Sequence, residues 1–303
     1  MDGGGKRRLL ILVVLTVFTL GLGYRATELS GPAESVAAEA VVVPRSPMRI
    51  SYGDSPETFG DLYLPSTSNT PLPVVILIHG GGWTQGRTLA QFDAHARTLA
   101  GDGVAVWNIE YRRVDGGGGW PVTLTDVDAA VDALADIVAP RLGNLLDLQR
   151  VHLAGHSAGG HLAAWAAGHR SAEPPSDSAI RIRSLTLMAA VLDLDLAVVD
   201  GRDPFVPKLL GGTPAQVPDR YRNASPINHL PANDTRITAL HGENDRVVFP
   251  LQSHRYVEAV SRAGGIADVR ILPGTGHGEF ADAASSAWNT ARQTIIGYAS
   301  TIS

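Results

Sequence analysis

The chain has 303 residues, a formal net charge of −5, 44% hydrophobic residues and no cysteine. This length suffices for one large α/β domain with a full buried core, or for two small ones. The charge gives no electrostatic reason to expect nucleic acid as a partner, and the absence of cysteine excludes disulfides, thiolate metal sites and cysteine nucleophiles.

The first 40 residues differ in character from the rest. Lys6-Arg7-Arg8 precedes an uncharged apolar run, residues 9–24, which is typical of an export signal. As a helix this run reaches about 24 Å, short of a hydrocarbon core of roughly 30 Å, which favours a cleaved signal peptide, with Ala38-Glu39-Ala40 as a candidate cleavage site. A membrane anchor formed by residues 9–24 is the alternative. In both cases we expect residues 41–303 to form a catalytic domain outside the cytoplasm, either secreted or periplasmic.

Beyond a linker, predicted strands and helices alternate along the chain. Strands are predicted at 48–52, 59–64, 74–78, 104–109, 151–154, 184–192, 237–240 and 269–272, and helices at 88–100, 124–137, 161–167 and 281–298. The continuous apolar run 74–78 is typical of a strand that is buried on both faces of a sheet. The alternation predicts an α/β fold with a mostly parallel central sheet and helices on both faces.

Two segments qualify this pattern. In the helix predicted at 124–137, the acidic residues lie on other faces than the apolar ones and are predicted to be solvated; they are Asp126, Asp128, Asp132 and Asp136.

Residues 193–231 are rich in proline and have little periodicity. An insertion at the carboxyl end of a strand lies above the active site of an α/β sheet, so a small lid is one interpretation and a surface excursion the other.

The most informative motif is Gly155-His156-Ser157-Ala158-Gly159, which lies between a predicted strand and a predicted helix. Glycines on both sides permit a sharp turn, and that turn exposes the Ser157 hydroxyl as a nucleophile. Ester or amide cleavage also needs a base, a group that orients the base, and donors to the oxyanion. We expect the backbone N–H of Ala158 to be one donor, with Gly81 and Gly82, after the strand 74–78, supplying others.

His277 is the predicted base, because it lies in a glycine-rich loop just past the last strand. Asp245 is the predicted orienting acid, since it follows the strand 237–240 by a few residues, and Glu243 is its weaker rival. The other histidines near strand ends and on helices are predicted to be structural or solvated. No His-Glu-x-x-His pattern or other metal motif occurs in the sequence, so we expect neither a metal nor a cofactor.

Together, His79-Gly80-Gly81-Gly82-Trp83, the Gly-x-Ser-x-Gly motif and the order Ser157, Asp245, His277 resemble the α/β-hydrolase superfamily. The likeness runs from Ser51 to the last residue and is closest to small-lid esterases, namely hormone-sensitive-lipase-like carboxylesterases and kynurenine formamidase-like hydrolases. His156 stands where many hormone-sensitive-lipase-like members have aspartate. Tyr111-Arg112-Arg113 and Trp120-Pro121 look more like the formamidase branch.

The resemblance implies an α/β-hydrolase fold and a serine hydrolase that cleaves short-chain carboxylic esters through an acyl-enzyme intermediate. The expected partner is a small-molecule ester or amide, with no nucleic acid and with membrane contact only through an N-terminal anchor. An amidase or formamidase with the same triad is the alternative enzyme. A catalytically silent binding module is an alternative of a different class.

Overall fold

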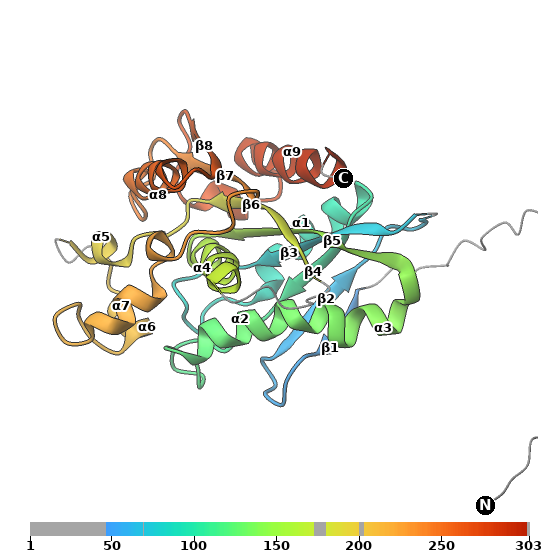
Figure 1. Cartoon of the computed structure of the whole chain (residues 1–303), viewed down its shortest axis with the longest axis horizontal. Helices are drawn as coiled ribbons and strands as arrows, with labels where there is room; N and C mark the ends of the chain where they lie inside the picture. Colours follow the sequence, from blue (N-terminus) through green and yellow to red (C-terminus); the bar gives the residue numbers. More distant parts are fainter. Residues whose placement is uncertain (1–46, 69, 173–179, 200–202, 302–303) are drawn as a thin grey trace, which may run out of the picture. The chain divides into compact units, whose positions relative to one another are not determined.

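Figure 1 shows the computed structural model of the chain, which describes residues 47–68, 70–172, 180–199 and 203–301. The signal peptide or anchor predicted within residues 1–40 lies outside these residues. In the part of the chain that is described, no helix combines the length and the hydropathy needed to cross a bilayer.

An eight-stranded sheet runs through the described residues in the order β1-β2-β4-β3-β5-β6-β7-β8. Its strands are β1 (Met48–Ser51), β2 (Phe59–Tyr63), β3 (Leu72–Ile78), β4 (Ala105–Ile109), β5 (Leu146–His156), β6 (Ile182–Met188), β7 (Arg236–Gly242) and β8 (Ile266–Leu272). β2 pairs antiparallel with β1 and β4, and every other neighbouring pair is parallel. The predicted, mostly parallel sheet is therefore confirmed.

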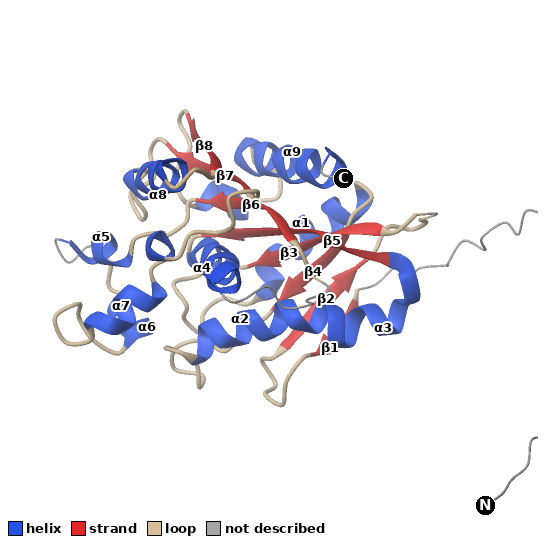
Figure 2. Cartoon of the chain, in the orientation of Figure 1, coloured by secondary structure: helices blue, strands red, loops and turns tan. Residues whose placement is uncertain are grey.

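Helices cover both faces of this sheet (Figure 2). They are α1 (Asp93–Gly101), α2 (Val122–Ala133), α3 (Ala139–Leu142), α4 (Ala158–Ala172), α5 (Leu194–Val198), α6 (Val206–Leu210), α7 (Pro218–Ala224), α8 (Leu251–Arg262) and α9 (Ser286–Thr301). Side chains alternate across a strand, so Val74, Ile76 and Ile78 of β3 join a core with α2, α4 and α8. Val75 and Leu77 join a second core with α1 and α9.

Among the predicted boundaries that differ from the structure, two have a local reason. The strand predicted to reach residue 192 ends at Met188, because Ala189 has a φ of +46°, outside the β region. Residues 189–192 are buried, as the residues of an inner strand would be, but they do not form a strand. The last helix begins at Ser286 rather than at residue 281. Its first turn is capped by Ser285, whose hydroxyl accepts the backbone N–H of Trp288.

The prediction of a solvated acidic face was wrong for Asp126. Its side chain is buried, and it accepts hydrogen bonds from the guanidinium of Arg112 at 2.6 and 2.8 Å and from the Arg112 backbone N–H at 3.0 Å. Asp132 and Asp136 are exposed and Asp128 is half-buried. A buried carboxylate requires such a partner. The helical periodicity could not reveal that Arg112 would be the partner of Asp126.

Candidate active site

Ser157 sits on a strained turn between β5 and α4. Its φ is +56°, a left-handed value that is rare for a residue with a side chain. The flanking glycines allow the close packing of this turn: a Cβ on Gly155 would lie 2.3 Å from the Gly159 carbonyl oxygen, and one on Gly159 would lie 2.1 Å from that of Ile78. The backbone N–H of Ser157 donates to the carbonyl of Met188 at 2.8 Å, which ties the turn to β6.

His277 and Asp245 follow neighbouring strands, and the structure brings them together. His277 lies beyond β8 and Asp245 beyond β7, and the parallel register of the two strands puts both at one edge of the sheet. His277 Nδ1 donates to Asp245 Oδ2 at 2.8 Å. Asp245 Oδ1 accepts the backbone N–H groups of Val247 and Val248, each at 2.9 Å. This carboxylate is therefore oriented on both oxygens.

The Asp245 carboxylate keeps its charge although its side chain is fully buried. Burial alone would raise its pKa, but the hydrogen bonds from His241, His277 and Val248 outweigh burial and hold the pKa well below its usual range. A charged acceptor fixes the proton of His277 on Nδ1 and leaves Nε2 free to act as a base.

Ser157 and His277 line one cavity of about 1020 Å³, here called the Ser157 cavity. Gly81 and Gly82 line it too, with φ values of +110° and +62° that favour glycine. Ala158 is the first residue of α4, so its N–H has no acceptor within the helix. The structure thus places every predicted site residue at or beside one cavity.

The rival residues have other contacts. Glu243 Oε2 accepts the N–H of Gly274 at 3.1 Å and so braces the loop that carries His277. His156 Nε2 donates to the His277 carbonyl at 2.9 Å, and burial, aided by the nearby His277, lowers its pKa to about 3. A histidine that stays neutral in this position is a structural support for His277 rather than a competing base.

A buried polar cluster beneath the glycine loop escaped the sequence analysis. Glu110 Oε1 accepts His79 Nε2 and Arg113 Nη1, each at 2.8 Å, and Oε2 accepts the Leu89 N–H at 3.1 Å. Burial would raise the pKa of Glu110, yet these contacts with His79, Arg113 and Leu89 lower it. His79 directly precedes the glycines, so the cluster anchors the loop that holds Gly81 and Gly82. The motif Tyr111-Arg112-Arg113 could be noticed in the sequence, but nothing there marked Glu110 as the acidic partner of Arg113.

The proline-rich segment 193–231 forms part of the wall of the Ser157 cavity. It folds into α5, α6 and α7, which lie together in Figure 1. Asp203 and Phe205, from this segment, line the cavity. A Cβ on Gly82 would lie 2.9 Å from the Phe205 ring, so the segment packs directly on the glycine loop.

Comparison with known proteins adds to this geometry. A family model described as BD-FAE matches residues 60–260. The chain is 32% identical to esterase LipC of Mycobacterium tuberculosis (strain ATCC 25618 / H37Rv) over 245 residues, which are 76% of this chain and 59% of LipC. It is 26% identical to kynurenine formamidase of Danio rerio over 221 residues, 72% of this chain and 69% of that relative. The chain therefore spans about three fifths of the length of LipC.

Solved structures with the same fold include a truncated carbohydrate esterase from gut microbiota, with a TM-score of 0.71 and 23% identity, covering 89% of this chain and 99% of that one. Another is Thermogutta terrifontis esterase 2 phosphorylated by paraoxon, with a TM-score of 0.65 and 22% identity, covering 82% and 92% of the two chains. The α/β-hydrolase fold predicted from the sequence is confirmed.

Proposed function

Because the chain belongs to the BD-FAE family, we propose that it is a serine hydrolase that cleaves short-chain carboxylic esters through an acyl-enzyme intermediate. The observation that carries this proposal is the pairing of His277 Nδ1 with the buried Asp245 carboxylate in a cavity that Ser157 also lines. Esterase LipC and the carbohydrate esterase, to which the chain is similar, support ester cleavage.

In the proposed reaction, Ser157 Oγ attacks the ester carbonyl carbon while His277 Nε2 takes the hydroxyl proton. The bond between that carbon and the alcohol oxygen then breaks, and His277 returns the proton to the leaving alcohol. A water molecule then attacks the acyl-enzyme while His277 takes its proton. His277 returns that proton to Ser157 Oγ as the carboxylic acid is released. Backbone N–H groups of Gly81, Gly82 and Ala158 donate to the oxyanion, and losing one such donor costs about 3 kcal/mol of transition-state stabilisation.

Hydrolysis of p-nitrophenyl acetate and butyrate tests the proposal. We expect Ser157→Ala and His277→Ala to abolish turnover, while Ser261→Ala and His254→Ala, matched changes at exposed positions of α8, keep the wild-type rate. Turnover by Ser157→Ala at the wild-type rate would refute the proposed nucleophile. A wild-type protein with no turnover on any ester or amide would favour a silent binding module.

Amide or formamide hydrolysis is the second candidate, and the similarity to kynurenine formamidases favours it. Both reactions need the same nucleophile, base and oxyanion donors, and they differ in the leaving group. Formanilide and p-nitroacetanilide, assayed beside the two esters, separate them. A kcat/KM for formanilide above that for p-nitrophenyl acetate would make the protein a formamidase.

We also propose that the chain is exported, with residues 9–24 as the apolar core of a signal peptide. The basic Lys6-Arg7-Arg8 and the shortness of the run support this proposal. N-terminal sequencing of the protein recovered from culture medium or periplasm tests it. A start near residue 41 agrees with cleavage, and an intact Met1 in the membrane fraction would indicate the anchor instead.

A further inference from the structure

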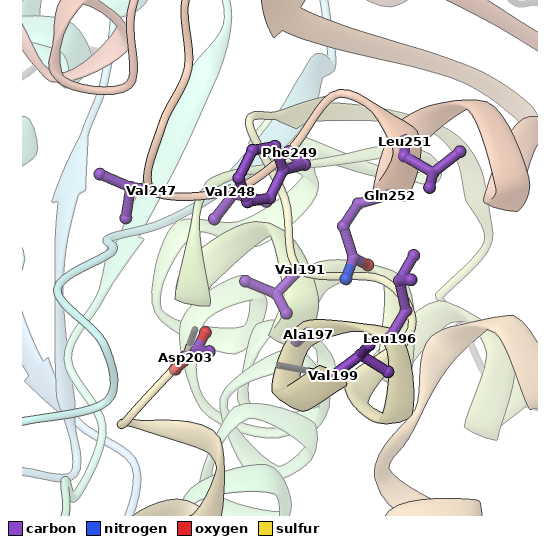
Figure 3. A pocket seen from close by; sticks show the side chains of 10 residues that line it. All are labelled: Val191, Leu196, Ala197, Val199, Asp203, Val247, Val248, Phe249, Leu251 and Gln252. Atoms are coloured by element: carbon purple, nitrogen blue, oxygen red, sulfur yellow. The ribbon is translucent and has the colours of Figure 1, made fainter. Parts of the chain in front are cut away.

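A second, apolar cavity of about 270 Å³ adjoins the Ser157 cavity (Figure 3). On one side it is lined by Leu196, Ala197 and Val199, from α5 and the residue after it, and on the other by the connection between β7 and α8. Val191 lies between the two sides. Eight of the ten lining side chains are apolar. At about 30 Å³ for each water-sized group, the space holds on the order of nine such groups.

The two cavities are neighbours that share part of their lining. Val191, Asp203, Val247 and Val248 line both of them. A molecule whose carbonyl is bound at Ser157 therefore lies beside the apolar cavity, with these four side chains at the boundary.

The two polar side chains that line the apolar cavity make hydrogen bonds within the fold. Gln252 Oε1 accepts the N–H groups of Leu192 and Asp193 at 2.9 and 2.7 Å, and its Nε2 donates to the Asp193 carbonyl. Asp203 Oδ1 accepts the N–H of Phe205 at 2.7 Å. Gln252 is thus fully used by the fold and Asp203 is held through one oxygen, and with eight apolar side chains in the lining the cavity suits an apolar ligand.

Exposed apolar side chains gather around this cavity. Val199, Val247, Phe249 and Leu251 are 52, 60, 40 and 52% exposed, and all four line it. Of the large apolar side chains that are exposed in the described residues, only Phe205 and Ile266 lie elsewhere, and Phe205 lines the Ser157 cavity. Apolar surface that is concentrated at one opening in this way indicates a binding site.

From this geometry we infer that the apolar cavity binds an alkyl or aryl group of the ester, and so makes the enzyme selective for substrates with an apolar substituent beyond the scissile bond. This inference rests on the proposed ester hydrolysis at Ser157. Either half of the ester can supply the group: the acyl chain or the alcohol. We expect each CH₂ that enters the cavity to multiply kcat/KM roughly fourfold.

Two substrate series distinguish the halves: p-nitrophenyl acetate to octanoate, and ethyl to octyl acetate. We expect kcat/KM of the wild type to rise more than tenfold along one of them. Ala197→Phe, which fills the cavity, and Leu251→Asp, which puts a carboxylate at its edge, should lower the ratio of long-chain to short-chain kcat/KM at least tenfold. Ile266→Asp is the matched control, since Ile266 is 51% exposed and lines neither cavity.

A flat profile along both series, or equal ratios in Ala197→Phe, Leu251→Asp and Ile266→Asp, would overturn the inference. Loss of turnover in Ser157→Ala confirms that the rates report on the proposed nucleophile. If the wild type cleaves no ester, binding of 1-octanol by saturation-transfer NMR replaces the kinetic readout. If the wild type then binds 1-octanol and Ala197→Phe does not, the apolar cavity is supported although the proposed function fails. If the wild type does not bind 1-octanol, the inference about the cavity is overturned as well.

Discussion

Replacing Asp245 with asparagine changes one atom of the site and leaves its surroundings in place. The side-chain oxygen of asparagine can still accept the N–H groups of Val247 and Val248, so the loop keeps its anchor. The new amide nitrogen takes the place of Oδ2, which lies 2.8 Å from His277 Nδ1. Because two N–H groups cannot face each other, His277 moves its proton to Nε2 and can no longer accept the proton of Ser157.

The same change in a serine protease triad lowers kcat about 10⁴-fold, which corresponds to about 5.5 kcal/mol of transition-state stabilisation. We expect a fall of about this size in kcat for p-nitrophenyl acetate, with a much smaller change in KM. Thermal unfolding checks that Asp245→Asn is folded, and Asp219→Asn, whose side chain is 78% exposed, is the matched control. A kcat within tenfold of the wild type would refute the role assigned to Asp245.

Three further changes test the loop and the buried groups. Gly82→Ala puts a methyl group 2.9 Å from the Phe205 ring at a φ of +62°, so it displaces an oxyanion donor; we expect kcat to fall about 10²-fold in steady-state assays. Glu110→Gln removes the charge that His79 and Arg113 face, and we expect urea unfolding to show a loss of about 3 kcal/mol. Burial lowers the pKa of His152 to about 3. Between pH 6.5 and 3 the unfolded chain therefore binds a proton that the folded chain does not, and stability falls by roughly 2 kcal/mol for this residue by pH 5.

Controls separate these effects from general damage. Gly101→Ala adds a methyl group in open space and should leave kcat unchanged. Glu258→Gln alters a carboxylate that is 58% exposed and should leave stability within about 0.5 kcal/mol. Equal rates in Gly82→Ala and Gly101→Ala, equal stability in Glu110→Gln and Glu258→Gln, or unfolding that is independent of pH between 7 and 5 would each contradict the corresponding expectation.

Local sequence predicted the strands wherever burial was continuous. The apolar run 74–78 lies within β3, and the strand predicted at 237–240 lies within β7. β5 begins at Leu146, five residues before its predicted start, because three of the residues 147–150 are polar and none of the four is buried, so they show no apolar run. The early start comes from the pairing of Leu146 and Asp147 with the start of β3, which lies far away in the sequence.

The candidate site was predictable to the extent that its residues follow buried strands. Ser157, Asp245 and His277 each come shortly after one, and parallel strands bring their carboxyl ends to one edge. The cluster around Glu110 was not predictable in this way. It depends on Arg113 meeting Glu57, 56 residues away, and on Glu110 meeting His79, 31 residues away, and such contacts leave no periodic pattern.

The proposed acyl-enzyme chemistry is tested most directly by covalent labelling with paraoxon, followed by intact-mass measurement and peptide mapping. We expect one diethylphosphoryl group for each chain, attached to Ser157, no label in Ser157→Ala, and much slower labelling in His277→Ala. A wild-type protein that remains unlabelled, or a label on any other residue, would contradict the proposal that Ser157 is the activated nucleophile.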